Sequence, residues 1–340
     1  MMLDKKSIIK ILNDYNLDKN KYMLISGAAL VFHGIKNKTH DIDIAVDKDY
    51  YNLLLKKYDC KFDRINEFNN DTYFIDDYIN FGTDYYKDKY DINDGIKVQS
   101  INDIKQLKSF LNRKKDINDI RCINEYLINN YNVNKKLKKY IKNNVFPIYK
   151  KNDLGHNLDH ILYVIERSLR FSKKVNDINY DMVYVASAYH DIGHFIDAKN
   201  HEKVSARMFR NDKFMKRFFS KDQIKIISDA IEDHRSSNKN TVRNIYGKIV
   251  STADKNTYIY DVLRRTYNYR IKHSPTSSLD EIINDSKNHI KEKFGYNGYA
   301  RKTYFKDNDY EKFLNSIDEL LNSNNFEKMF CVVNKINMKY

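Results

Sequence analysis

Hydrophobic and polar residues alternate differently in the two parts of this chain. In the N-terminal part, apolar residues between Ile8 and Tyr15 fall on one helical face behind Ser7, the expected N-cap. Residues 22–34 form an apolar run that a small-residue turn interrupts, which predicts a strand, a tight turn and a helix. Residues 41–46 begin with polar and apolar positions in alternation, the pattern of a strand with one polar face.

From residue 156 onward, the spacing of the apolar residues is that of helices. One helical run follows His160, and a second spans residues 182–189. Two further amphipathic stretches, residues 279–294 and 310–321, complete the C-terminal part. We therefore predict an α+β chain in which a domain with a mixed sheet precedes an all-α domain.

The length of 340 residues exceeds that of a usual single domain and predicts two. Residues 131–150 are rich in lysine and helical in tendency, and they contain Pro147, one of only two prolines in the chain. We interpret them as a basic connecting helix between a first domain, residues 1–130, and a second, residues 151–340. A phosphate-binding arm is the alternative interpretation of this lysine-rich stretch.

The formal net charge of +14 arises entirely after residue 100. Residues 1–100 carry 15 Lys and Arg against 17 Asp and Glu, whereas residues 101–150 carry 12 against 4. This bias would attract a polyanion such as RNA or a nucleotide. The alternative is a lysine-rich solvated surface without a partner.

Cysteine usage and the apolar pattern bear on the compartment. The three cysteines, Cys60, Cys122 and Cys331, are widely spaced and odd in number, so they indicate neither a disulfide framework nor a zinc site. No apolar stretch near the N-terminus is long enough for a signal peptide or a membrane span. We therefore expect a cytoplasmic protein without a membrane partner.

Two aspartates mark the first candidate site. Asp41 and Asp43 project from one face of the predicted strand, and the turn at Ser26 and Gly27 precedes them. Such a carboxylate pair, near a turn whose amides open a helix, can hold a divalent metal and the phosphates it carries. Roughly residues 20–125 resemble the polymerase-β-like nucleotidyltransferases, in which a glycine-containing turn precedes an Asp-x-Asp strand and a third carboxylate completes a two-metal site. The resemblance implies nucleotide binding through these four residues, with Mg²⁺ as the cofactor if the site is active.

The third carboxylate of that family has no clear counterpart in this sequence. The downstream strand expected at residues 78–81 places Asn80 where an acid would stand, with Asp76 and Asp77 nearby. An amide cannot supply the negative charge that a second Mg²⁺ requires. The domain therefore either transfers nucleotides or binds them without transfer.

Histidines are concentrated in a second candidate site. Six of the ten lie between residues 156 and 255: His156, His160, His190, His194, His201 and His234. Imidazoles with interspersed carboxylates suit Mn, Fe, Co, Ni or Zn, and this window lacks the cysteines of a structural thiolate site. If helices converge on one cavity, four residues form a natural ligand set: His160, His190, Asp191 and Asp254. His201 and His234 would then hold a second ion, with Asp191 between the two.

This order of a histidine, a His-Asp pair and a later aspartate resembles the HD superfamily of metal-dependent phosphohydrolases, over roughly residues 145–260. The resemblance implies hydrolysis of a phosphoester or phosphoanhydride by water that two ions activate beside Asp191. We expect His194 to orient this water or to protonate the leaving group, unless it only caps its helix. Lys255 is expected to bind phosphate oxygens.

Three functional hypotheses follow from the two candidate sites. The first is a metal-dependent phosphohydrolase acting on a nucleotide or nucleic acid, RNA included, with a first domain that binds or transfers nucleotides. The second is an active nucleotidyltransferase that modifies RNA, a small molecule or a protein, while the HD domain edits the product. The third is a nucleotide sensor in which both sites bind and neither turns over.

Overall fold

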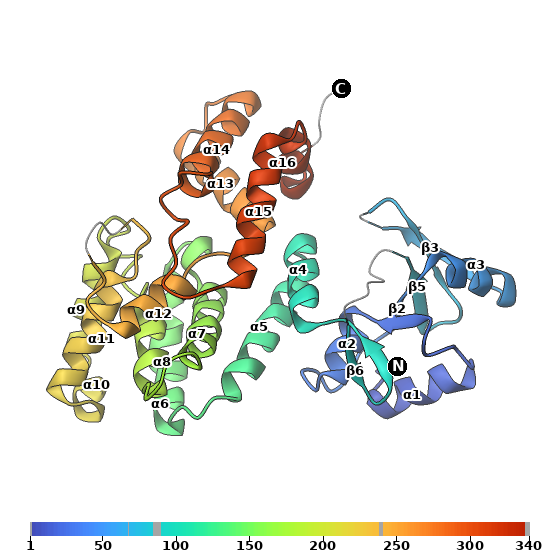
Figure 1. The fold of residues 1–340 in the computed structure, drawn as a ribbon, viewed down its shortest axis with the longest axis horizontal. Helices are drawn as coiled ribbons and strands as arrows, with labels where there is room; N and C mark the ends of the chain where they lie inside the picture. The colour runs from blue at the N-terminus through green and yellow to red at the C-terminus, as the bar shows by residue number, and fades with distance from the viewer. Residues whose placement is uncertain (1, 67, 84–89, 238–240, 337–340) are drawn as a thin grey trace. The chain divides into compact units, whose positions relative to one another are not determined.

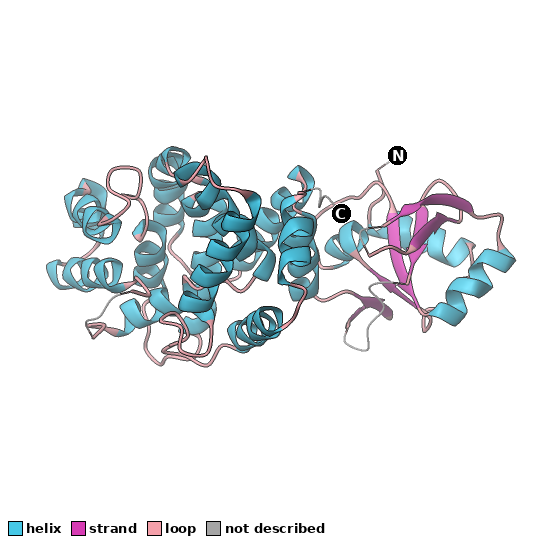
Figure 2. Cartoon of the chain, turned by 90° about the horizontal axis from the view of Figure 1, so that it is seen from above, coloured by secondary structure: helices cyan, strands magenta, loops and turns pink. Residues whose placement is uncertain are grey.

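The computed structural model describes residues 2–66, 68–83, 90–237 and 241–336. The chain divides into two compact units, Met1–Arg113 and Lys114–Tyr340. In the described part of the chain, all strands belong to the first unit and the second unit is helical (Figures 1 and 2). The predicted fold class, a mixed sheet followed by an all-α region, is confirmed.

A mixed sheet forms the centre of the first unit. Its elements are α1 (Lys5–Asp14), β1 (Tyr22–Leu24), α2 (Ser26–Phe32), β2 (Ile42–Val46), α3 (Lys48–Lys57), β3 (Lys61–Ile65), β4 (Asp71–Phe74), β5 (Ile79–Gly82), β6 (Asp91–Asn93), β7 (Ile96–Val98) and α4 (Ile101–Leu111). Among the described residues, seven strands pair in the order β3-β4-β5-β2-β1-β7-β6, with β1–β7 and β2–β5 parallel. Every residue of β2 except Asp43 is buried, so the middle of the sheet carries the core of this unit.

The strand, turn and helix predicted for residues 22–34 are confirmed as β1 and α2. The expected N-cap of α1 was wrong. Asp4 is the N-cap, and its carboxylate accepts hydrogen bonds from the amide of Ser7 at 2.9 Å and from its hydroxyl at 2.8 Å. Ser7 lies in the first turn because the carboxylate three residues earlier already accepts its amide hydrogen.

The second unit is a helical assembly. Its elements are α5 (Lys114–Asn129), α6 (Lys135–Tyr140), η1 (Ile141–Val145), η2 (Phe146–Lys151), η3 (Leu154–His156), α7 (Leu158–Ser172), α8 (Tyr180–Tyr189), α9 (His201–Asn211), α10 (Lys213–Phe218), α11 (Lys221–Asp233), α12 (Ile245–Ala253), α13 (Ile259–His273), α14 (Leu279–Phe294), α15 (Asn308–Asn322) and α16 (Phe326–Asn334). The basic stretch predicted as a connecting helix lies inside this unit. Within the ranges that the structure describes, no helix is both long and apolar enough to cross a bilayer.

Helix α8 is the central helix of the second unit. All its residues from Met182 to Tyr189 are buried, and α7, α11 and α12 pack against it. A helix that is apolar on every side lies in the core of a domain. Because α8 is buried as far as its last residue, Tyr189, its C-terminal end lies inside the unit. The His-Asp pair that follows α8 is therefore buried by the fold.

Candidate metal centre

His190 and Asp191 extend from the buried C-terminal end of α8. The exposed fraction of His190 is 0% and that of Asp191 is 2%. The Nδ1 atom of His190 lies 2.8 Å from the carbonyl oxygen of Ser187, one turn earlier in α8. This contact fixes the ring and leaves Nε2 to face the neighbouring helices.

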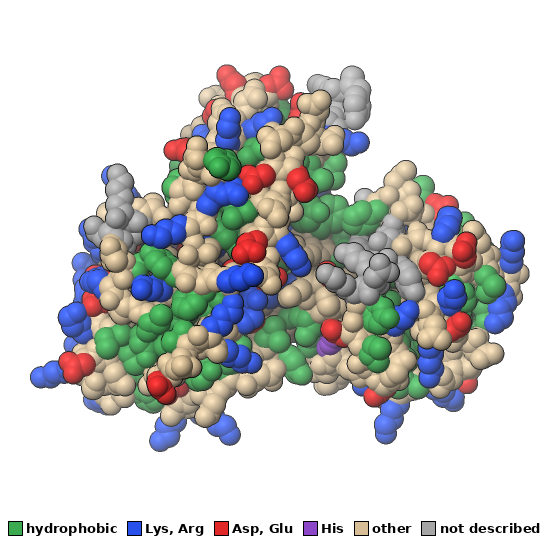
Figure 3. All heavy atoms as spheres, viewed as in Figure 1, with side chains coloured by type: hydrophobic (Ala, Val, Ile, Leu, Met, Phe, Trp, Pro, Cys, Tyr) green, Lys and Arg blue, Asp and Glu red, His purple; other side chains and the backbone are tan. Residues whose placement is uncertain are grey.

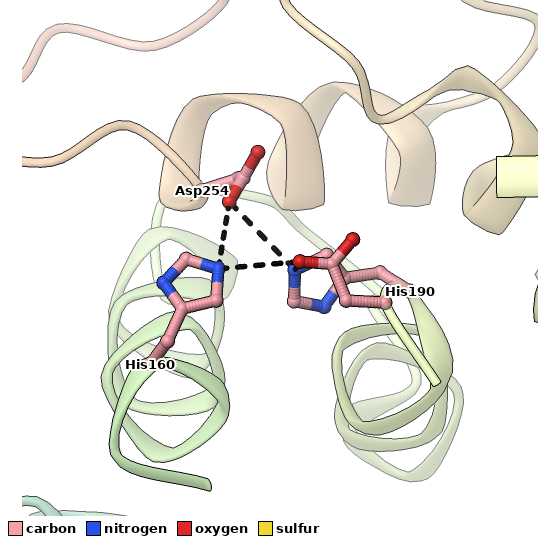
Figure 4. A group of neighbouring side chains, drawn as sticks. His160, His190 and Asp254 are labelled. Carbon is pink, nitrogen blue, oxygen red and sulfur yellow. Dashed lines mark ion pairs between the residues drawn. The ribbon is translucent and has the colours of Figure 1, made fainter. Parts of the chain in front are cut away.

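The first ligand group joins these two residues to His160 in α7 and Asp254, the C-cap of α12 (Figure 4). The Nε2 atom of His160 lies 3.1 Å from Oδ1 of Asp254 and 3.5 Å from Oδ2 of Asp191. The Nε2 atom of His190 lies 3.2 Å from Oδ2 of Asp191 and 3.7 Å from Oδ1 of Asp254. The four residues named from the sequence thus meet at one point.

The second ligand group uses the other oxygen of the same aspartate. Oδ1 of Asp191 lies 3.2 Å from Nε2 of His201, the first residue of α9, and 3.3 Å from Nε2 of His234, the C-cap of α11. The two Nε2 atoms are 3.3 Å apart. Their Nδ1 atoms face the carbonyl oxygens of Ala198 at 2.9 Å and Ile231 at 2.7 Å. Asp191 therefore presents one carboxylate oxygen to each group.

The donor atoms of this centre fit a divalent metal. Among the described residues, Nε2 of His160, Nε2 of His190 and Oδ1 of Asp191 are buried without a hydrogen-bond partner, although opposing donors lie close by. Buried polar atoms without partners are costly. An ion in the first group would satisfy the two imidazole nitrogens, and an ion in the second group would satisfy Oδ1 of Asp191. Imidazole nitrogen with carboxylate oxygen is a donor set suited to first-row transition metals or zinc.

Comparison with known families agrees with this geometry. The model of the HD domain family matches residues 157–258, a stretch that contains both ligand groups. Residues 157–258 form an HD domain. Searches for relatives found no matching curated protein and no matching solved structure. The HD domain with its buried His/Asp cluster is that of a metal-dependent phosphohydrolase.

Opposite charges in the HD domain shift the protonation of its ligands. Burial opposes the charged form of Asp254, but His160 and His190 outweigh it and hold the pKa of Asp254 well below its ordinary value. Burial likewise disfavours a charged His190, yet Asp191 and Asp254 raise the pKa of this histidine to about 10. The carboxylates are therefore ionised at neutral pH, as metal ligands must be.

Gly193 allows helix α9 to approach the turn that follows α8. A Cβ at this position would lie 2.6 Å from Cγ1 of Val204 and 2.8 Å from the amide nitrogen of Ser205. The amide of Gly193 instead donates a hydrogen bond of 2.9 Å to Oγ of Ser205. This close packing holds the start of α9, and with it His201, beside Asp191.

Two further residues predicted for catalysis lie around the centre. The ring of His194 is 5.3 Å from that of His201, between centroids, and it belongs to neither ligand group of the dinuclear pair. Lys255 is buried, and its ammonium donates to the carbonyl of Ala300 at 2.8 Å and to Oγ of Ser236 at 3.4 Å. The catalytic roles of both residues remain predictions.

The candidate residues of the first unit do not form a comparable cluster. Asp41 directly precedes β2, and Asp43 lies within it opposite Asn80 of β5. Within the described residues, neither aspartate belongs to a group of donors close enough to share an ion. The amide of Ser26, whose φ is +53°, donates to Oε1 of Gln99 at 3.1 Å, and a Cβ at Gly27 would lie 2.5 Å from Oγ1 of Thr39. The turn is thus tightly packed, and its role in nucleotide binding remains a prediction.

Sequence reasoning missed a buried arginine that supports Asp254. Arg167 in α7 donates from Nε to the carbonyl of Ala253 at 3.0 Å and from Nη2 to Oδ2 of Asp307 at 2.5 Å. Both side chains of this ion pair are 1% exposed. Arg167 comes seven residues after His160 and therefore lies on the same helical face, which is the signal that could have identified it.

Proposed function

We propose that this chain hydrolyses a phosphoester or phosphoanhydride of a nucleotide or nucleic acid at a dinuclear centre in the HD domain. The observation that carries the proposal is the carboxylate of Asp191, which gives Oδ2 to one ligand group and Oδ1 to the other. A carboxylate that offers one oxygen to each of two ions can hold them at the short separation of a two-metal hydrolytic site. RNA and free nucleotides are the candidate substrates.

Two divalent ions in these groups would supply Lewis-acid activation of water and of the phosphoryl oxygen. The chain itself sets the spacing of the ligand groups, excludes water and orients the imidazole rings. Asp191 fixes how far apart the two groups lie, and the burial of His190 keeps bulk water from the inner side of the site. The carbonyl groups facing Nδ1 of His190, His201 and His234 hold the three rings in place.

His194 and Lys255 are proposed to act on the substrate. Burial and the charge of His156 lower the pKa of His194 to about 4. His194 is then neutral at pH 7 and suited to accept a hydrogen bond from water, which favours orientation of the nucleophile over protonation of the leaving group. Burial lowers the pKa of Lys255 to about 8, so its ammonium is mostly charged and can bind phosphate if it exchanges the carbonyl of Ala300 for the substrate.

The substitution Asp191→Asn tests the proposal. It keeps the shape of the side chain but removes the charge that both ligand groups share. We expect hydrolysis of a panel of nucleotides, cyclic nucleotides and RNA ends to fall by more than the roughly 10–100-fold seen when only an outer partner of a ligand is lost. Phosphate or nucleotide release is measured with added Mn²⁺, and Asp280→Asn at an exposed position of α14 is the control. Undiminished turnover in Asp191→Asn would refute the hydrolase proposal.

A second candidate function belongs to the first unit. We propose that it binds a nucleotide at Ser26, Gly27, Asp41 and Asp43. Because Asn80 stands opposite Asp43 and donates to Oδ2 of Asp63 at 3.1 Å, a neutral amide separates the two acids, which favours binding over transfer. Incubation with labelled nucleoside triphosphates and Mg²⁺ tests this. Label transfer that is lost in Asp43→Ala would instead support the nucleotidyltransferase hypothesis, and binding without any turnover at either site would support a sensor.

A further inference from the structure

A third group of metal-binding side chains lies beside the dinuclear centre. It consists of Asp153, His156 and His194, which offer donor atoms that all lie within 4.8 Å of one another. Asp153 is the N-cap of the short helix η3, His156 is the last residue of that helix, and His194 comes from the turn after α8. None of the three residues belongs to the two groups that share Asp191.

Asp153 is held so that its two oxygens face different imidazoles. Oδ1 accepts hydrogen bonds from the amides of Gly155 at 2.8 Å and His156 at 3.1 Å, and it lies 2.8 Å from Nδ1 of His156. Oδ2 lies 3.9 Å from Nδ1 of His194. Asp153 thus has one oxygen fixed at the start of η3 and the other directed toward His194.

The two imidazoles of this group stack on each other. Their centroids are 3.8 Å apart and their planes differ by 19°. Two protonated rings could not stack this closely without strong repulsion, whereas neutral imidazoles are metal ligands. Ligands about 2.1 Å from an ion lie roughly 3–4 Å from one another, so the separations in this group need only small side-chain movements to admit an ion.

The third group is continuous with the dinuclear centre. Six imidazoles follow one another in a closed ring whose neighbouring centroids are 3.8–6.0 Å apart: His156, His160, His190, His234, His201 and His194. Asn152 ties the two parts together, since its Nδ2 donates to the carbonyls of His156 at 3.0 Å and Asp191 at 2.9 Å. An ion in the third group would therefore lie directly beside the dinuclear centre.

We infer that Asp153, His156 and His194 form a third site for a divalent transition metal, at the more exposed side of the centre. Two histidines and one carboxylate leave open coordination positions, and the side chain of Asp153 is 47% exposed, so these positions are accessible to a ligand from solution. The ion would bind a second phosphate group of the substrate. It would also occupy the unprotonated nitrogen of His194, so this histidine would accept a hydrogen bond from water only while the third site is empty. This inference rests on the proposed function. It predicts that the HD domain prefers substrates with two or more phosphates over monophosphates.

Mn²⁺ binding to the full chain tests the third site without an activity measurement. Equilibrium dialysis followed by metal analysis should give three Mn²⁺ ions per chain, with the third bound more weakly because its ligands are more exposed. Asp153→Ala and His156→Ala should each bind two. His273→Ala, which removes an exposed histidine of α13, is the matched control and should bind three.

The outcomes separate this inference from the proposed function. Two ions in the unsubstituted chain, or three ions that persist in Asp153→Ala and His156→Ala, would overturn the third site and leave the dinuclear centre intact. Fewer than two ions would contradict both. Circular dichroism of each variant establishes that it is folded. If Asp153→Ala does not fold, anomalous scattering from Mn²⁺ in crystals of the unsubstituted chain decides, because the third site requires a peak between Asp153 and His194.

Discussion

Three ligand imidazoles of the HD domain are oriented by the same local contact. The Nδ1 atoms of His190, His201 and His234 each face the carbonyl oxygen of the residue three positions earlier. Each histidine lies at the end or the start of a helix, where such a carbonyl is free to accept. When these rings bind an ion as neutral imidazoles, this contact keeps the proton on Nδ1 and leaves the lone pair of Nε2 for the ion.

At the residue scale, the lowered pKa of His194 predicts that the stability of the fold declines in acid. Burial lowers its pKa to about 4 in the folded chain, while the unfolded value is about 6.5. Between these values the unfolded chain binds a proton that the folded chain does not, so stability is full above pH 6.5 and declines as the pH falls toward 4. After allowance for solvent screening, we expect a loss on the order of 1–2 kcal/mol.

Metal-free chain is used to measure this effect, with the midpoint of thermal unfolding recorded from pH 7.5 to pH 4. The substitution His194→Gln should flatten the decline, whereas His273→Gln on the surface should leave it unchanged. An equally steep decline in His194→Gln would show that other groups cause the acid sensitivity.

At the scale of elements, the end of α12 is supported from behind by α7 and by the segment before α15. Arg167 of α7 donates to the carbonyls of Ala253 at 3.0 Å and Thr252 at 3.4 Å, the two residues before Asp254. Asp307 neutralises the guanidinium from outside the HD domain. The position of a metal ligand thus depends on a residue of the C-terminal part.

The substitution Asp307→Asn should destabilise the chain by about 3–5 kcal/mol, because it leaves a buried guanidinium without its counter-charge. Asp309→Asn is the matched control two residues away. It removes one of two acidic partners of Arg170, from an ion pair whose side chains are 39% and 25% exposed, so its cost should be at most about 1 kcal/mol. Urea unfolding measures both free energies, and equal losses would contradict the role given to the buried pair.

The helices of the second unit and the ligand residues on them could be predicted from the sequence, since both follow from short-range patterns. The stretch expected at residues 279–294 is α14 with the same bounds, and the run 182–189 lies within α8. The ion pair of Arg167 and Asp307 joins residues 140 positions apart, and no local pattern indicates which acid the arginine meets. Asp153 was missed because it precedes a three-residue helix, which has no hydrophobic period.

The strands of the first unit illustrate the same limit. β2 was predicted because polar and apolar residues alternate at the start of residues 41–46, and the structure confirms it with its apolar residues buried. β6 and β7 have three residues each, which is too short for a period. The place of β7 in the sheet follows from its pairing with β1 and β6, which no local pattern indicates. The identity of this unit as a nucleotidyltransferase stays a prediction for a related reason, since it rests on a turn and two aspartates.

At the scale of the whole molecule, the chain combines a sheet-based unit and a helical unit with separate candidate sites. Lys and Arg side chains are spread over the face drawn in Figure 3 and are interspersed with acidic ones. Dispersed charge of this kind raises the attraction for any polyanion without choosing among them. Selection of the substrate is therefore expected from the two sites themselves.

Separate sites predict additive effects of substitution. Asp43→Asn should weaken binding of a Mg²⁺–nucleoside triphosphate to the chain, and it should leave the number of Mn²⁺ ions bound by the HD domain unchanged. Asp191→Asn should lower the number of Mn²⁺ ions bound by the HD domain and should leave binding of the Mg²⁺–nucleoside triphosphate unchanged. Isothermal titration of the two single variants and of the double variant measures both. A change in Mn²⁺ binding in Asp43→Asn would show that the sites are coupled.

The pairing of Arg167 with Asp307 also constrains when, during synthesis of the chain, the metal ligands can take up their final positions. A ribosome delivers the chain from its N-terminus, so the arginine leaves the exit tunnel 140 residues before its counter-charge. Until then the Arg167 guanidinium lacks the Asp307 carboxylate that neutralises it in the core. Its hydrogen bonds to the carbonyls of Thr252 and Ala253, just before Asp254, are therefore not yet stabilised. We therefore expect metal to be loaded only after the segment that carries Asp307 has been synthesised, which is well after the sheet-based unit.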